Sequence, residues 1–182
     1  MLKLNRIYKE GNMLTIIFAI LNIILGVVAV VMFTQPVFGI YNISDGGLEG
    51  LETGLFNQSV FDMIRFEEGQ SVYLTVGAIA LILALVFAGA MLIMTLINLI
   101  TKATKNRSYV SSRWFALFFF IFMALATIMF AVYMATDVPL LGEDGWNALV
   151  EQGIVLSIGW GIIVSLICSF FSVIFAPGKN KG

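Results

Sequence analysis

The chain has 182 residues, a formal net charge of -1 and no histidine; 60% of its residues are hydrophobic and 12% are charged. Ordinary soluble domains have roughly 25% charged residues, so this composition indicates a membrane protein. The near-neutral charge gives no field that would attract nucleic acid, and one cysteine without histidine excludes an intrachain disulfide and the usual zinc and haem sites.

Four long apolar runs contain no charged residue: 13–33, 72–100, 115–135 and 153–176. Each reaches the length of about 20 residues that a helix needs to cross a membrane, and lipid requires the backbone to satisfy its own hydrogen bonds. The first run is too long for a signal peptide and lacks a small-x-small cleavage site, so we expect a retained helix. The sequence therefore predicts an all-α membrane protein with four transmembrane helices, in a single domain spanning 1–182.

The basic residues identify the cytoplasmic side. Nine of the ten lysines and arginines lie before the first run, between the second and third runs (101–114), or in the tail at 177–182. Ten of the eleven acidic residues lie in the two other connections, 34–71 and 136–152, which become outer loops. Because basic loops stay in the cytoplasm, we expect both chain termini there and the protein in the plasma (cytoplasmic) membrane.

Small and polar residues follow one face of the first run. They alternate in spacing between four and three residues, as in a left-handed helix pair: Thr15, Ala19, Asn22, Gly26 and Ala29. Asn22 lies near the middle of the membrane, where it either contacts a substrate or ion or makes an interhelical hydrogen bond. We favour the hydrogen bond.

The first outer loop is the largest segment outside the membrane, and we expect it to cap the bundle and carry specificity. It holds two possible glycosylation sequons, at Asn42 and Asn57, both on the outer side. Its acidic residues follow no calcium-loop pattern, so a solvated surface is expected. Arg65 lies three positions from both Asp62 and Glu68, which would neutralise it.

The other three runs carry ladders of small residues, which let neighbouring helix backbones approach closely. The ladder is Ala80, Ala84 and Ala88 in the second run, Ala124, Thr127, Ala131 and Ala135 in the third, and Gly153, Ser157, Gly161, Ser165 and Ser169 in the fourth. Such ladders either pack one chain or form a dimer interface, and we favour packing within a compact left-handed bundle. Cys168 is expected to be a small buried hydrophobe, with S-acylation as the alternative.

Three local motifs can be compared with a known family. Leu156, Gly159 and Trp160 form Leu-x-x-Gly-Trp at the start of the fourth run. Gly54-Leu55-Phe56 lies in the first outer loop, and Arg65 precedes the second run. With the inside termini and the long first and short second outer loops, these features resemble the claudin and peripheral-myelin-protein superfamily of four-helix membrane proteins. The resemblance implies a membrane-organising, adhesive or accessory-subunit role.

The chain also departs from that family. Its first outer loop has neither the paired cysteines nor the tryptophans of the family and is short for the usual extracellular sheet. The tail at 177–182 lacks the claudin ending that binds scaffold domains. These differences argue against sealing of tight junctions as the function.

The sequence thus predicts a non-enzymatic membrane protein with no cofactor and no metal, whose partners are the lipid bilayer and other membrane proteins or further copies of itself. No ionisable group lies within the four runs, whereas ion-coupled carriers and voltage sensors normally need one. The alternatives are an oligomeric pore lined by Asn22, Ser157, Ser165 and Ser169, or an accessory subunit of a transporter or exporter complex.

Overall fold

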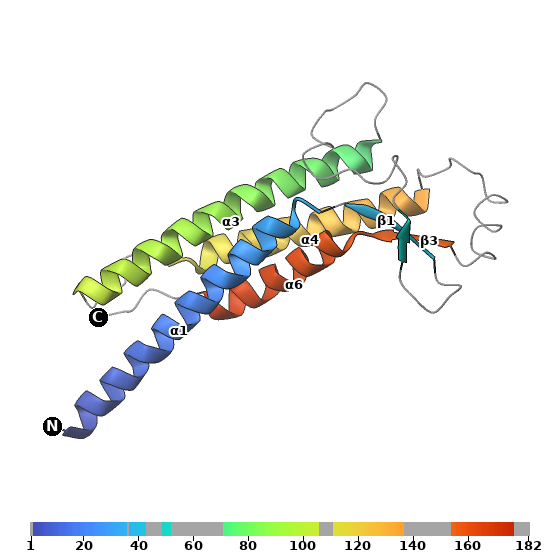
Figure 1. The fold of residues 1–182 in the computed structure, drawn as a ribbon. Coiled ribbons are helices and arrows are strands. Elements are labelled where there is room, and N and C mark those ends of the chain that lie inside the picture. The colour runs from blue at the N-terminus through green and yellow to red at the C-terminus, as the bar shows by residue number, and fades with distance from the viewer. Residues whose placement is uncertain are drawn as a thin grey trace.

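Four helices and three strands make up the described part of the chain, which comprises residues 2–35, 37–42, 49–51, 71–105, 111–136 and 154–176 of a computed structural model (Figure 1). In chain order they are α1 (Leu2–Met32), β1 (Phe38–Asn42), β2 (Glu49–Leu51), α3 (Val72–Lys105), α4 (Arg113–Thr136), β3 (Ile154–Ile158) and α6 (Trp160–Phe175).

Three of these helices are long and apolar enough to cross a membrane. They are α1 through its segment Met13–Met32, α3 through Val72–Thr101, and the whole of α4. The fourth, α6, is also apolar but has 16 residues, which is about 24 Å at a rise of ~1.5 Å per residue. The prediction of four apolar helices is confirmed, and three of them have the length and composition of membrane spans.

The helices form an elongated bundle in which α1 and α4 run one way and α3 and α6 the other (Figure 1). α3 packs mainly against α4, and α1 packs mainly against α6. The start of α1 and the end of α6 lie at the same end of the bundle (Figure 1). There the Nε of Arg113 donates a hydrogen bond to the carbonyl of Ala176 (3.2 Å), joining the start of α4 to the end of α6.

We call this the basic end, because α1, α3 and α4 bring these residues to it: Lys3, Arg6, Lys9, Lys102, Lys105 and Arg113. Three helices are longer than predicted here. α1 begins at Leu2 rather than at residue 13, α3 continues to Lys105 rather than ending at residue 100, and α4 begins at Arg113 rather than at residue 115. Water can satisfy the terminal backbone groups of a helix, so none of them has to end where its apolar run ends.

A small sheet that the sequence analysis did not predict lies at the opposite end (Figure 1). Its strand order is β2-β1-β3, and both pairs are antiparallel. β1 follows α1 after a short turn, whereas β3 leads directly into α6. The register places Ile40 opposite Leu51 on one side and opposite Leu156 on the other. The sheet therefore joins the chain segment after α1 to the segment before α6.

The fourth apolar run differs from the prediction, which placed one helix over 153–176. Residues Ile154–Ile158 form β3, and α6 begins only at Trp160. Three of the five strand residues are β-branched, which favours extended structure, and β1 supplies a backbone partner for each of them. The backbone is therefore satisfied without a helix, and the predicted helix start at residue 153 is corrected to Trp160.

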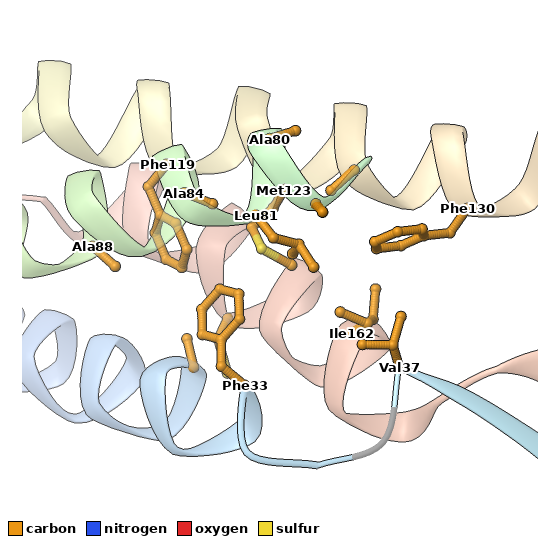
Figure 2. Close-up of a cluster of buried hydrophobic side chains, with 14 of the residues drawn as sticks. Phe33, Val37, Ala80, Leu81, Ala84, Ala88, Phe119, Met123, Phe130 and Ile162 are labelled. Atoms are coloured by element: carbon orange, nitrogen blue, oxygen red, sulfur yellow. The ribbon is translucent and has the colours of Figure 1, made fainter. Parts of the chain in front are cut away.

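A hydrophobic core fills the space between the helices, and Figure 2 shows a part of it. Phe33, just after α1, Leu81 of α3 and Phe130 of α4 are each almost fully buried in it. The core continues to the sheet, because the ring of Phe38 in β1 lies 5.5 Å from that of Phe130 and 5.8 Å from that of Tyr133. These contacts fix the sheet on the end of the bundle.

Candidate functional site

Polar side chains are buried between α1 and α6. We call them the polar seam and define it as Asn22 of α1 with Ser165, Ser169 and Ser172 of α6, all 0% exposed. A polar group buried without a hydrogen bond costs roughly 1–3 kcal/mol. The partners of these four side chains therefore decide what the seam contributes.

Two hydrogen bonds cross the seam. Asn22 Nδ2 donates to the backbone carbonyl of Ser172 (3.0 Å), and Ser165 Oγ donates to the carbonyl of Ala29 (3.1 Å). Ser169 Oγ donates within its own helix, to the carbonyl of Leu166 (2.7 Å). A carbonyl oxygen has two lone pairs, so it can accept such a bond in addition to its helical one. The seam thus ties α1 to α6 at two levels.

Glycines on both sides of the bundle allow the helices to approach closely. A Cβ at Gly161 would meet the backbone carbonyl of Met32 and lie 2.7 Å from Gln35 Cβ. A Cβ at Gly26 would lie 2.7 Å from Leu92 Cδ2 and would also touch Met91 of α3. Neither position has room for a methyl group without a shift of its neighbours. Gly161 therefore sets the spacing of α1 and α6, and Gly26 that of α1 and α3.

The alanine ladder of α3 faces the interior. Ala80, Ala84 and Ala88 are 0–2% exposed and belong to one cluster with Phe119 and Met123 of α4 (Figure 2). Large side chains of α4 thus fill the space that the small side chains of α3 leave. This packing takes place within one chain.

In α4 the buried face is not the one that the sequence analysis selected. The buried residues are Ala116, Phe119, Met123, Ala126 and Phe130. Of the predicted ladder, Ala124 and Thr127 are half-buried, whereas Ala131 and Ala135 are exposed. The reason is that aromatic rings of α4 pack on small positions of α3: a Cβ at Gly77 would lie 2.6 Å from the ring of Phe130. Small residues line the α3 side of this contact, and aromatic residues line the α4 side.

The remaining positions of the fourth ladder and its family-like motif lie on or next to β3. Ser157 is opposite Gly39 in the sheet, so it does not continue the stripe of α6 as predicted; Leu156 is also in β3. The N–H of Gly159 donates to the carbonyl of Val37 (2.7 Å) and extends the β1–β3 ladder by one bond. Trp160 begins α6 and is 56% exposed.

Several predicted residues lie outside the described part of the chain. They are Gly54, Leu55, Phe56, Asn57, Arg65 and Gly153. The other possible glycosylation site, Asn42, ends β1 and is paired with Glu49 and Ile154. The backbone of Asn42 is thus part of the central strand of the sheet.

The sequence analysis missed four buried polar residues, one of which, Ser172, belongs to the polar seam. They are Thr95 and Asn98 of α3, Ser112 before α4, and Ser172 of α6, each 0–3% exposed. A signal for three of them was available, because Thr95 and Asn98 continue the buried stripe of α3 and Ser172 continues that of α6 at helical spacing. Thr95, Asn98 and Ser172 lie in the parts of α3 and α6 that are nearer the basic end, whereas Ser165 of the polar seam lies nearer the sheet.

Within the described ranges no cluster of three His, Cys, Asp or Glu side chains could hold a metal ion. Cys168 is a buried free thiol on the inner face of α6. No protein-family model, no curated protein and no solved structure matches the chain. The arrangement of the residues is therefore the basis for the proposals that follow.

Proposed function

We propose that the protein is a non-enzymatic tetraspan of the plasma membrane that acts as a structural, membrane-organising or accessory subunit. The observation that carries this proposal is that side chains of the polar seam form hydrogen bonds between α1 and α6. Asn22 and Ser165 are 0% exposed and donate to carbonyls of the same chain. A polar side chain used in this way holds helices together.

The lipid-facing surface supports the same proposal. Large apolar side chains point outward from every helix, among them Val27 of α1, Val86 of α3, Ile128 of α4 and Ile174 of α6, each at least 47% exposed. Such a surface suits lipid tails and the helices of other membrane proteins equally. We propose that a partner binds on these faces and on the first outer loop.

The basic end is proposed to face the cytoplasm, with both termini on that side and the helices in a left-handed bundle. Basic residues of α1, α3 and α4 gather there, as the positive-inside rule requires of a cytoplasmic end. The sheet would then lie on the outer side of the membrane.

We further propose a distant relation to the claudin and peripheral-myelin-protein superfamily. The sequence features that resemble it are supported by the sheet, because an extracellular sheet is usual in that family. Here β1 comes from the connection after α1 and β3 from the connection before α6, and the two strands pair along their whole length. A membrane-organising or adhesive role follows from this relation.

Purification from the native membrane in a mild detergent tests the proposal. A photo-crosslinking residue in place of Val86, which is 60% exposed, should form an adduct with a partner protein present in a fixed ratio. The matched control is the same residue at Leu81, a large side chain that is 0% exposed, where it should crosslink only within the chain. Absence of any adduct at Val86 and at other outward positions, with a protein that purifies alone, would contradict the accessory role.

The pore alternative requires a separate measurement. The purified protein should pass no current in a planar bilayer, and Asn22→Leu should change nothing in that recording. Ile20→Leu, on the lipid side of the same helix, is the control. A current that Asn22→Leu alters and Ile20→Leu leaves unchanged would replace the structural proposal with the pore.

A further inference from the structure

Three buried polar atoms have no hydrogen-bond partner within the described part of the chain. They are Oδ1 of Asn22, Oγ1 of Thr95 and Oγ of Ser172, which belong to α1, α3 and α6 respectively. The three residues are each 0% exposed. Buried polar atoms without partners are rare in folded proteins and need an explanation, the more so in a bundle surrounded by lipid.

Thr95 differs in this respect from other helical threonines of the chain. Thr101, Thr127 and Thr136 each donate to the carbonyl four residues earlier in their own helix, over 2.8–2.9 Å. This bond is the usual way for a helical hydroxyl to be satisfied in a membrane. Thr95 is the most deeply buried of the four and does not make it. Its hydroxyl therefore remains without a partner in a fully buried position.

The contacts of α1 with α3 and with α6 indicate that the three residues lie at a similar level of the bundle. Asn22 contacts Ser172 directly through its Nδ2 (3.0 Å). Gly26, one turn after Asn22, lies against Met91 of α3, and Thr95 comes one turn after Met91. Because α1 and α3 run in opposite directions, Thr95 is set one turn from that contact toward the basic end, as Asn22 is (Figure 1).

The chemistry of the three atoms defines what they bind. Asn22 directs its amide N–H to the Ser172 carbonyl, so its Oδ1 can only accept a further bond. The hydroxyls of Thr95 and Ser172 each have a hydrogen to donate and lone pairs that accept. A cation would leave both hydroxyl hydrogens without an acceptor. A water molecule accepts from the two hydroxyls and donates to Oδ1, and buried waters typically make about three such bonds.

We infer that Asn22, Thr95 and Ser172 bind an internal water molecule that joins α1, α3 and α6 inside the membrane. Asn22 and Ser172 hold it from the polar seam, and Thr95 holds it from α3. Direct hydrogen bonds link α1 to α6, and Gly26 of α1 makes apolar contact with Met91 and Leu92 of α3. The water therefore adds the polar connection between α3 and the seam.

The sign of two stability changes tests the inference. If the water is bound, Thr95→Val and Ser172→Ala each remove one of its partners, and each should lower Tm in detergent by about 2–4 °C. If no water is bound, each variant removes a buried group that has no partner, and Tm should stay the same or rise. An unchanged or raised Tm for both variants would overturn the inference.

Two matched controls and a double variant complete the test. Ser169→Ala and Thr127→Val remove hydroxyls that bond to their own helix, so each should shift Tm by less than either test variant. Since Thr95 and Ser172 would share one water, the double variant should lower Tm by less than the sum of the single effects. Additive effects would show that the two hydroxyls do not share a ligand.

Solid-state NMR in bilayers can detect the water directly. With isotope-labelled asparagine, magnetisation should pass from water to the side-chain amide of Asn22, whose signal is identified by its loss in Asn22→Leu. The transfer should disappear in the double variant of Thr95 and Ser172 while the amide signal itself remains. Transfer that is absent from the unaltered protein would contradict the inference even if the stability changes had the expected sign.

Discussion

Ser165 Oγ on α6 donates a hydrogen bond to the backbone carbonyl of Ala29 on α1, over 3.1 Å and in a fully buried position. The acceptor is backbone, so this contact constrains where α6 lies along α1 without requiring any particular side chain at position 29. Gly161, one turn earlier on α6, lies against the carbonyl of Met32. The two contacts together set the register of the α1–α6 pair.

Removal of the Ser165 hydroxyl should therefore weaken the bundle. Interhelical hydrogen bonds in membrane proteins contribute about 0.6 kcal/mol on average and up to about 1.7 kcal/mol. We expect Ser165→Ala to lower Tm by about 1–4 °C, measured by thermal unfolding in detergent. Ser165→Thr keeps the hydroxyl and serves as the control for its chemistry. An unchanged Tm in Ser165→Ala would mean that the hydrogen bond contributes nothing to stability.

Gly161→Ala should destabilise the bundle more than the addition of one methyl group suggests. The added methyl would meet backbone of α1, which cannot rotate away as a side chain can. We expect a loss of about 1–3 kcal/mol, the usual cost of overpacking, and Gly161→Leu should disrupt the bundle further. Gly89→Ala is the matched control, because nothing lies within 4 Å of the added Cβ. Equal Tm values for the two alanine variants would contradict the close approach of α1 and α6.

Arg113 connects the start of α4 to the end of α6 through Ala176. The guanidinium also places a positive charge at the carboxyl end of α6, where it is favourable. We expect Arg113→Gln to cost less than about 1 kcal/mol, because the side chain is exposed and water competes for the contact. Arg113→Lys separates the two effects, since it keeps the charge and loses the Nε donor. Thermal unfolding at low and high salt would separate the effect of the charge from that of the hydrogen bond, because salt reduces only the charge effect.

The helices of this fold are largely predictable from sequence, because charge is excluded from long apolar runs by a penalty of several kcal/mol. On α1 and α3 the ladders at Asn22, Gly26, Ala80, Ala84 and Ala88 are the positions that the structure buries. Each is a small or polar residue in a helix otherwise rich in large apolar side chains. In such a helix only the inner face has a reason to be small.

Two features could not be read from one sequence. The partner of β3 is β1, which lies more than a hundred residues away, and pairing of this kind is decided by tertiary contact. In α4 the choice of face depends on Gly77 and Phe87 of α3, which receive the rings of Phe130 and Phe122. The alanine ladder of α4 predicted the wrong face of the helix. The large side chains of α4 point inward instead, as Phe130 does where it packs on Gly77 of α3.

The two exposed tryptophans of the described chain should lie at opposite membrane interfaces. Trp114 begins α4 at the basic end, and Trp160 begins α6 at the sheet end. Single-tryptophan variants, with the other two tryptophans changed to phenylalanine, can be compared in brominated lipids. Fluorescence of both should be quenched more strongly by bromines near the headgroups than by bromines near the bilayer centre. Stronger quenching of Trp160 by bromines near the bilayer centre would indicate that the sheet lies inside the membrane.

The register of the sheet can be tested by cysteine pairs in a Cys168→Ala background. Ile40 lies opposite Leu156, and Tyr41 lies opposite Val155. Successive pairs of an antiparallel ladder alternate between hydrogen-bonded and non-hydrogen-bonded types, so one of these two is the closer, non-hydrogen-bonded pair. Cysteines at that pair should form a disulfide on mild oxidation, because their Cα atoms are within the range that a disulfide spans.

The mispaired control is Ile40→Cys with Ile158→Cys, which keeps the same two strands but shifts the pairing by two residues. Diagonal neighbours of this kind lie about 7–8 Å apart, too far for an unstrained disulfide. We expect the paired cysteines to crosslink much faster than the shifted ones, measured by gel mobility with and without reductant. Faster crosslinking of the shifted pair would mean that β3 is displaced along β1, and a chain in which 153–176 is one continuous helix would crosslink neither pair.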